Sequence, residues 1–375
     1  MTTERTLSAP GKLFLAGEYS VLWANSPSPP AGERAGEKGG PTGVARVLAA
    51  GPRAHALVRR RADRRVELVL EGGRLAGDTT PLGVRWERPP EPAFHFVAGT
   101  IDLALRVVGR ETEGFTVAFE SSPLVNGHKL GLGSSARAVV LAAEAARTGL
   151  DADFDSLKLA LVAHAEAQGG TGSGGDVAAC FAGGLVRYRR YEVASLITAA
   201  NQETLRAALP ESPPVELLRV AVPKFPLAFA FSGESASTTS LVREVERTWT
   251  AEQRARFVLD SDALGDELES SLARGDFGAA RDAARGLQER LDSLGPTRSE
   301  ALERILQLAE TFGCAGKQSG AGGGDGCLLF GPDDAAVDAF IGACASRGIF
   351  ATRVTPEPGL RGEATRHPLL ASWLE

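Results

Sequence analysis

Alternating apolar and polar residues mark several short stretches of this chain as strands that bury one face. Residues 5–21 predict two short strands around a tight turn, and residues 54–70 predict a hairpin that turns at Ala62 and Asp63. The same alternation predicts a strand over residues 115–119. These segments together predict a sheet in the first half of the chain.

Elsewhere the apolar residues recur at every third or fourth position, which indicates amphipathic helices. In the first half the predicted helices cover residues 93–108, 135–147 and 156–167, the last of them capped by Asp155 or Ser156. In the second half the predicted strands cover 218–222, 227–231, 327–330 and 350–354, with helical stretches between 251 and 312 and over 333–346. Prolines at 210, 213 and 214 mark the junction, so we predict mixed α and β structure in two domains, residues 1–210 and 211–375.

Charge and cysteine content exclude several classes of protein. The 375 residues have a net charge of −6, which argues against a protein that coats nucleic acid. The four cysteines show no CxxC spacing and the five histidines form no ligand pair along the sequence, so neither a disulfide framework nor a zinc site is expected. No run of about 18 apolar residues occurs, and residues 1–12 lack an apolar signal segment. We therefore expect a cytoplasmic protein that binds neither nucleic acid nor a membrane.

Glycine is over-represented, with 44 residues, and its distribution is uneven. Three tracts bounded by apolar runs, at residues 131–133, 169–184 and 320–326, predict backbone that approaches a ligand closely. A fourth stretch, residues 26–42, mixes Gly with Pro, Glu and Lys and has almost no apolar residue. We expect a disordered surface insertion there.

The first tract precedes a predicted helix, which makes it a candidate phosphate site. Free backbone N–H groups and the positive end of a helix meet there, and the hydroxyl groups of Ser134 and Ser135 can bind a phosphate oxygen or Mg²⁺. A dinucleotide fingerprint is excluded because no predicted strand runs directly into Gly131, and no P-loop sequence occurs. The remaining alternative is a plain turn at the entry to a helix.

Three side chains near these tracts are candidates for chemistry. Asp176 follows the second tract's Gly-Ser-Gly-Gly run and is either a helix cap or a catalytic carboxylate. Lys12 lies in an apolar strand pattern, and only six of the 41 lysine and arginine residues are lysines, which favours a chemical role. Its alternative is an edge-strand lysine with its ammonium group in water. His164 is expected to pack on its helix, although its nearness in sequence to Asp176 leaves a minor role in the site open.

Taken in order, the tracts resemble the motifs of the GHMP kinase superfamily, whose members phosphorylate galactose, homoserine, mevalonate and phosphomevalonate. Residues 9–22 (APGKLFLAGEYSVL) resemble the first motif, residues 129–136 (KLGLGSSA) the second and residues 317–325 (KQSGAGGGD) the third. Within the superfamily the details are most similar to the phosphomevalonate kinases. One such detail is that residues 233–240 resemble the Gly-x-x-Ala-Ser-Thr segment of that family's second domain.

The resemblance implies the GHMP kinase fold, an α+β fold. Its N-terminal α/β domain has a left-handed βαβ crossover and its C-terminal domain is ferredoxin-like, with the site in the cleft between them. The implied activity is ATP- and Mg²⁺-dependent phosphorylation of 5-phosphomevalonate to 5-diphosphomevalonate. The alternatives are a mevalonate kinase, which phosphorylates the C5 hydroxyl group, and a non-catalytic relative that binds a nucleotide or a sugar. ATP and the small-molecule substrate are the expected partners of a monomer or homodimer.

The resemblance also implies roles for individual residues. Lys12 and Asp176 are implied to be catalytic, and Ser135 is implied to be a Mg²⁺ ligand. The residues implied to bind ATP are Gly131, Leu132, Gly133, Ser134, Ser135 and Ala136. Those implied to bind the substrate are Glu18, Tyr19, Ser173, Lys317, Ser319, Gly322 and Gly323.

A doubly charged substrate needs cations, and the motifs contain three. Lys129, Arg137 and Lys317 are the candidates for binding its phosphate. Arg137 departs from the family's pattern, which more often has a small residue at this position. It either binds a phosphate or faces solvent.

Overall fold

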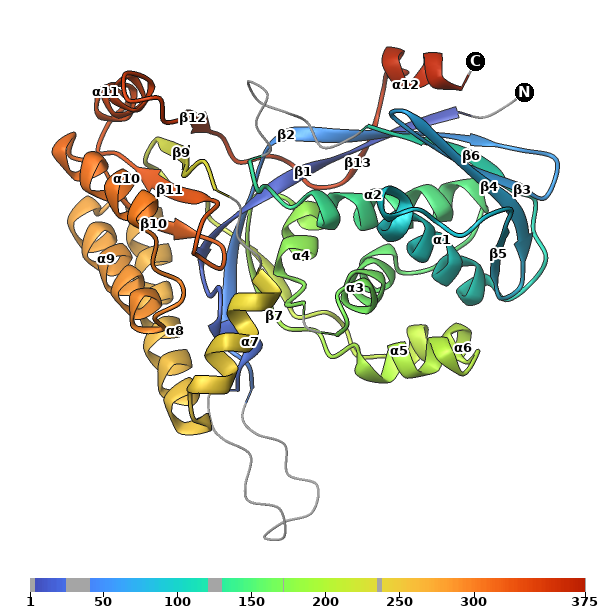
Figure 1. The fold of residues 1–375 in the computed structure, drawn as a ribbon, viewed down its shortest axis with the longest axis horizontal. Coiled ribbons are helices and arrows are strands. Elements are labelled where there is room, and N and C mark those ends of the chain that lie inside the picture. The colour runs from blue at the N-terminus through green and yellow to red at the C-terminus, as the bar shows by residue number, and fades with distance from the viewer. Residues whose placement is uncertain (1–3, 25–40, 121–129, 171, 235–237, 375) are drawn as a thin grey trace, which may run out of the picture.

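The computed structural model describes residues 4–24, 41–120, 130–170, 172–234 and 238–374 of the chain. Its elements form a large and a small sheet, each covered by helices, and the long strands β1 and β2 run from one half of the molecule to the other (Figure 1). Nearly all of the predicted insertion at 26–42 lies outside the described residues, and so does Lys129. Within the described ranges, none of the helices combines the length and the apolar character that crossing a membrane requires.

Among the described residues the large sheet has nine strands, and most of its pairings are antiparallel. Its strands are β1 (Glu4–Ala16), β2 (Val44–Arg60), β3 (Arg65–Leu70), β4 (Gly73–Thr80), β5 (Gly83–Trp86), β6 (Phe115–Phe119), β7 (Leu185–Arg189), β8 (Leu217–Val220) and β13 (Arg361–Glu363). Their main order is β13-β1-β2-β6-β3-β4-β5, and β7 pairs with both β2 and β8.

Two local predictions about this sheet are wrong. Residues 5–21 do not form two short strands, because β1 continues unbroken to Ala16 and is followed by the short 3-10 helix η1 (Ser20–Leu22). The predicted hairpin over 54–70 is also absent, because β6 lies between its two strands, antiparallel to β2 and parallel to β3. Local alternation indicates which face of a strand is buried, but it does not identify the strand's partner.

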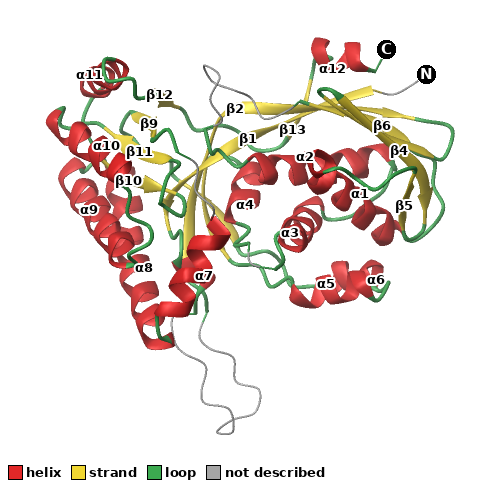
Figure 2. Ribbon diagram, in the orientation of Figure 1, coloured by secondary structure: helices red, strands yellow, loops and turns green. Residues whose placement is uncertain are grey.

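Helices cover the two faces of the large sheet unequally (Figure 2). The helices of this half are η2 (Pro92–Phe94), α1 (His95–Val108), α2 (Ser134–Gly149), α3 (Ser156–Ala167), α4 (Gly175–Ala182), α5 (Ala194–Asn201), α6 (Leu205–Glu211) and α12 (Pro368–Trp373). Ala56 and Val58 of β2 belong to the main core that the sheet shares with α1 to α4. Leu57 lies between them and packs with Leu370 of α12, so the C-terminal helix lies on the opposite face.

The small sheet is antiparallel throughout, in the order β10-β11-β9-β12. Its strands and helices are β9 (Leu227–Phe231), α7 (Thr238–Thr248), α8 (Ala251–Arg274), α9 (Phe277–Ser293), α10 (Glu300–Thr311), β10 (Ala315–Ser319), β11 (Gly326–Phe330), α11 (Asp334–Ala345) and β12 (Ala351–Val354). The succession of a strand, a helical region, two strands, a helix and a strand is that of a ferredoxin-like domain. The predicted α+β class is therefore confirmed.

The predicted division into residues 1–210 and 211–375 does not coincide with the two sheets. Strand β8 lies beyond residue 210 and pairs with β7, and β13 returns from the end of the chain to pair with β1. Both strands therefore belong to the large sheet, and the division stays a prediction.

Candidate active site

Helix α2 begins after a glycine, which offers no side chain to cap its first backbone N–H groups. Its N-cap residue is Gly133, which has a φ of 79° and provides no side-chain acceptor. A Cβ atom there would lie 3.0 Å from Cγ of Lys12, so both the backbone conformation and the space favour glycine. Uncapped N–H groups at a helix N-terminus bind anions, because the helix dipole adds to their partial positive charge. The start of α2 can therefore bind an anion, and its assignment as the phosphate site stays a prediction.

A buried histidine lies between the start of α2 and the start of α4. His164 on α3 is 2% exposed, and its Nε2 atom lies 3.1 Å from Oγ of Ser135 and 3.8 Å from Oδ2 of Asp176. The amide nitrogen of Gln168, the C-cap residue of α3, lies 3.1 Å from the same Nε2 atom. Asp176 is not the helix cap, because Gly174 occupies that position of α4. The three side chains from α2, α3 and α4 thus form one polar cluster.

At Lys12, strand β1 pairs with β2 on one side, and on the other side the main chain of Lys12 bonds to the second motif. Its backbone N–H group donates to the carbonyl oxygen of Leu132 at 3.1 Å, and its ammonium group donates to the carbonyl oxygen of Gly131 at 3.3 Å. The side chain is half-buried, with its ammonium nitrogen 5.5 Å from the centre of the Phe14 ring. The predicted catalytic lysine therefore lies directly beside the predicted phosphate tract.

A cavity of about 120 Å³ lies between the two sheets. Lys12 and Asp176 line it, together with the predicted substrate residues Glu18, Tyr19 and Ser173. Its other lining residues are Phe14, Leu22, His164, Gln168, Gly172, Val242, Gly320, Ala321 and Asp325. Residues from both halves of the chain, including the third motif, thus line one cavity.

Glu18 and Lys317 form an ion pair in the protein interior. Their side chains are only 3% and 2% exposed, and the ammonium group of Lys317 also donates to the carbonyl oxygen of Gln318 at 2.5 Å. Lys317 does not line the cavity, although its partner Glu18 does. The adjacent Tyr19 hydroxyl group donates to the carbonyl oxygen of Ala321 at 2.8 Å, and burial, followed by the charge of Glu18, raises the pKa of this phenol.

The other residues of the third motif that are predicted to bind substrate make contacts with neighbouring parts of the fold. Ser319 accepts a hydrogen bond at 2.7 Å from the backbone N–H group of Phe14, which links β10 to β1. A Cβ atom at Gly322 would lie 2.5 Å from the carbonyl oxygen of Thr297, and the N–H group of Gly323 donates to the same oxygen at 2.8 Å. These three residues are not among those that line the cavity, whereas Gly320 and Ala321 of the same motif are.

A second cavity lies on the other side of the α2 N-terminus. Ser134 and Ser135 line it, with the aromatic rings of Phe96 and Phe119 and the side chain of Arg137. Arg137 is 4% exposed and donates to the carbonyl oxygen of Pro52 at 2.9 Å, so the solvent-facing alternative is wrong. Burial lowers the pKa of its guanidinium group.

The sequence predicts only a minor role in the site for His164 and does not identify Gln168 as a residue of the site. The signal was present, because Gln168 follows His164 by four positions at the end of one helix, a spacing that brings two side chains to the same face. That face points toward Ser135, whose position relative to α3 the sequence does not reveal.

Comparison with known proteins identifies the class. The model of the GHMP kinases N terminal domain matches residues 95–184, and the model of the GHMP kinases C terminal domain matches residues 268–349. Among solved structures, the Lin0012 protein from Listeria innocua superposes with a TM-score of 0.82 at 21% identity, covering 97% of this chain and 100% of that one. The two family-model matches place the chain among the GHMP kinases, which are phosphotransferases that act on small molecules.

Two further relatives indicate which family within this class the chain belongs to. Phosphomevalonate kinase from Streptomyces sp. (strain CL190) is 32% identical over 361 residues, which cover 87% of this chain and 90% of the relative. Streptococcus pneumoniae phosphomevalonate kinase in complex with phosphomevalonate and AMPPNP superposes with a TM-score of 0.73 at 21% identity, covering 93% of this chain and 99% of that one. The chain therefore belongs to the phosphomevalonate kinase family of the GHMP kinases.

Proposed function

We propose that this chain transfers the terminal phosphoryl group of ATP to 5-phosphomevalonate and releases 5-diphosphomevalonate and ADP. The observation that supports this most directly is the uncapped start of α2 between two cavities, with Lys12 beside it. The identity of the acceptor rests on the Streptomyces relative. Phosphoryl transfer requires mainly positioning and charge neutralisation, and these elements supply both.

The nucleotide is placed in the second cavity, with its phosphates at the start of α2. Phe96 and Phe119 offer apolar surface to a base, and the N–H groups that follow Gly133 bind the phosphate oxygens. Residues 131–136 provide the turn and the hydroxyl groups that this role requires.

Two oxygen-bearing side chains fit a Mg²⁺ ion. Mg²⁺ prefers oxygen ligands, and the Ser135 hydroxyl group and the Asp176 carboxylate both approach the same nitrogen of His164. When bound, Mg²⁺ neutralises charge on the phosphate oxygens. The Nε2 atom of His164 is within hydrogen-bond distance of the Ser135 hydroxyl group and lies 3.8 Å from the Asp176 carboxylate, and its Nδ1 atom is buried with no hydrogen-bond partner among the residues that the structure describes.

The acceptor is placed in the first cavity, near Lys12 and Asp176. Its phosphate oxygen is already largely ionised at neutral pH, because the second pKa of a phosphate monoester is about 6. A general base is therefore less important than a cation that holds the two negative phosphates together. Lys12 supplies that cation, and Asp176 orients Lys12 and water. Glu18, Tyr19 and the residues of the third motif shape the cavity wall.

Measuring ADP release in a coupled assay, with mevalonate and 5-phosphomevalonate compared side by side, tests this function. We expect turnover with 5-phosphomevalonate and little with mevalonate. The reverse preference indicates a mevalonate kinase, and no turnover with either indicates a non-catalytic binding protein.

The division of labour between Lys12 and Asp176 is tested with two variants. Asp176→Asn is expected to lower kcat less than Lys12→Ala does, because the acceptor needs charge neutralisation more than it needs a base. The opposite order would show that proton removal by Asp176 dominates and would refute this mechanism.

A further inference from the structure

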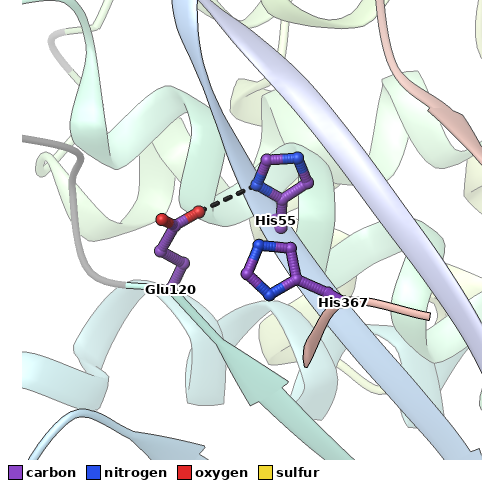
Figure 3. A group of neighbouring side chains, drawn as sticks. All are labelled: His55, Glu120 and His367. Atoms are coloured by element: carbon purple, nitrogen blue, oxygen red, sulfur yellow. Dashed lines mark hydrogen bonds and ion pairs between the residues drawn. The ribbon is translucent and has the colours of Figure 1, made fainter. Parts of the chain in front are cut away.

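Three side chains from distant parts of the chain meet near the C-terminal helix (Figure 3). His55 lies on β2, Glu120 directly follows β6 and His367 directly precedes α12. Strand alternation places His55 on the same face as Leu57 and Glu120 on the same face as Ala118. Both apolar residues belong to the cluster that packs against α12, so all three polar side chains lie on the α12 face of the large sheet.

Their spacing is that of potential ligands of a single ion. The Nδ1 atom of His55 lies 2.9 Å from Oε2 of Glu120, and the ring centroids of His55 and His367 are 4.6 Å apart. One ligand atom from each residue lies within 4.8 Å of the other two. Ligands of a tetrahedral zinc ion bound at 2.0–2.1 Å are about 3.3 Å apart, so modest side-chain rotations close the site.

We propose that His55, Glu120 and His367 bind a divalent transition-metal cation of the zinc type, which fastens the C-terminal segment to the large sheet. Two imidazoles and one carboxylate suit Zn²⁺ better than Mg²⁺, which prefers oxygen ligands alone. The expectation from sequence that the histidines form no ligand pair considered only their spacing along the chain. The fold brings together residues that are up to 312 positions apart, from His55 to His367.

The surroundings allow an ion to enter and to be held. The side chains of His55 and Glu120 are 25% and 26% exposed, so an ion reaches them from solvent and water completes its coordination. His367 contributes a nitrogen that is only weakly engaged, because its Nδ1 atom accepts from the N–H group of Leu370 at 3.4 Å. The hydrogen bond between His55 and Glu120 orients both groups before the ion binds.

The consequence of binding is a cross-link between three separate parts of the fold. Strand β13 has three residues and α12 has six, and arginine side chains of the large sheet, such as Arg59 bonded to the carbonyl oxygen of Leu374 at 2.9 Å, already fasten this end of the chain. An ion shared by His55, Glu120 and His367 adds a link from α12 to β2 and β6. It is distinct from the proposed Mg²⁺ site, which uses Ser135 and Asp176.

The test uses the full chain, stripped of metal with a chelator and then titrated with Zn²⁺ by calorimetry. We expect one Zn²⁺ ion per chain, and tetrahedral Co²⁺ absorption when Co²⁺ replaces it. His55→Asn and His367→Asn should each weaken Zn²⁺ binding on the order of 100-fold or more, since even partners of the ligands contribute 10–100-fold. His95→Asn is the control, because His95 is exposed on α1 and should leave binding unchanged.

Two further measurements separate ligand loss from misfolding and from the Mg²⁺ site. Far-UV circular dichroism of each variant without metal should match the wild type, and Zn²⁺ should raise the Tm of the wild type but not of His367→Asn. Zn²⁺ binding should persist in Asp176→Asn, whether or not that variant is active. Absence of stoichiometric binding by the wild type, or equal binding by the His55→Asn/His367→Asn double variant, would overturn the proposal.

Discussion

The buried ion pair between Glu18 and Lys317 predicts a large loss of stability when either charge is removed alone. Both side chains are at most 3% exposed, so each depends on the other to offset its transfer out of water. Removing one partner of such a pair costs about 3–5 kcal/mol, because the other charge is left buried. We therefore expect Lys317→Met to lower the free energy of unfolding by about 3–5 kcal/mol, measured by urea unfolding.

Two controls show whether the loss comes from the unpaired charge. Lys317→Met combined with Glu18→Gln removes both charges, and it should recover about 0.5–3 kcal/mol relative to the sum of the single variants. Arg256→Met breaks an exposed pair with Asp260 on α8, in which the arginine side chain is 76% exposed. That change should cost less than about 1 kcal/mol.

The same variants decide whether Lys317 binds substrate, as the sequence predicts, or supports the fold. In Lys317→Met the uncompensated carboxylate of Glu18 lines the cavity and repels an anionic acceptor, so KM should rise. If Lys317 is structural, KM returns toward the wild-type value in the double variant. A KM that stays high in the double variant, with Lys317→Met losing less than about 1 kcal/mol of stability, would refute this reasoning and make Lys317 a substrate ligand.

Three further predictions concern single side chains. His164→Asn should lower kcat about 10–100-fold and raise the Mg²⁺ concentration needed for half-maximal rate, because it removes the imidazole that contacts both the Ser135 hydroxyl group and the Asp176 carboxylate; a change in Tm alone would contradict this. Gly149→Ala should lower the free energy of unfolding in urea by about 1–3 kcal/mol, because its Cβ atom would lie 2.4 Å from Cγ of Phe115. Gly342→Ala is the control: its Cβ atom would meet nothing within 4 Å, so it should raise the free energy of unfolding by about 0.4–1 kcal/mol. Equal stabilities of the two variants would show that the core adapts around Gly149→Ala. Burial raises the pKa of the Cys180 thiol to about 12, so native protein should resist iodoacetamide at this residue at mildly alkaline pH, and labelling as fast as in the unfolded chain would disprove that burial.

Features set by neighbouring residues were predictable from the sequence. The helix predicted over 93–108 is α1 (His95–Val108), and the strand predicted over 115–119 is β6, because their periodicity is local. The glycine tract at 131–133 does precede a helix, and Asp155 caps α3 by accepting from the N–H group of Lys158 at 3.0 Å. Propensity and capping act over a few residues, so the sequence contains the whole signal.

Features that depend on distant residues were not predictable. The carboxylate of Glu18 and the ammonium group of Lys317 are 299 positions apart, and no periodicity links them. The contact between His164 and Ser135 depends on how α3 packs against α2, and the position of β6 depends on a parallel pairing with β3. Such contacts are set by the packing of the whole core, which a single sequence does not display.

Strand β1 explains how one lysine comes to face the site. Leu13 and Leu15 pack into the core shared with the small sheet and with α8 and α9, whereas Phe14 packs into the core shared with α2 and α4. Because side chains alternate along a strand, Lys12 lies on the face of Phe14, where a Cβ atom at Gly133 would touch it. The register between β1 and β2 shifts on both sides of Lys12, between Ala9 and Gly11 and between Phe14 and Ala16. The alignment that places Lys12 on this face therefore applies only to the short stretch between the two shifts. A slip of one residue would turn Lys12 into the apolar core of the small sheet, so the site depends on both sheets holding β1 in register.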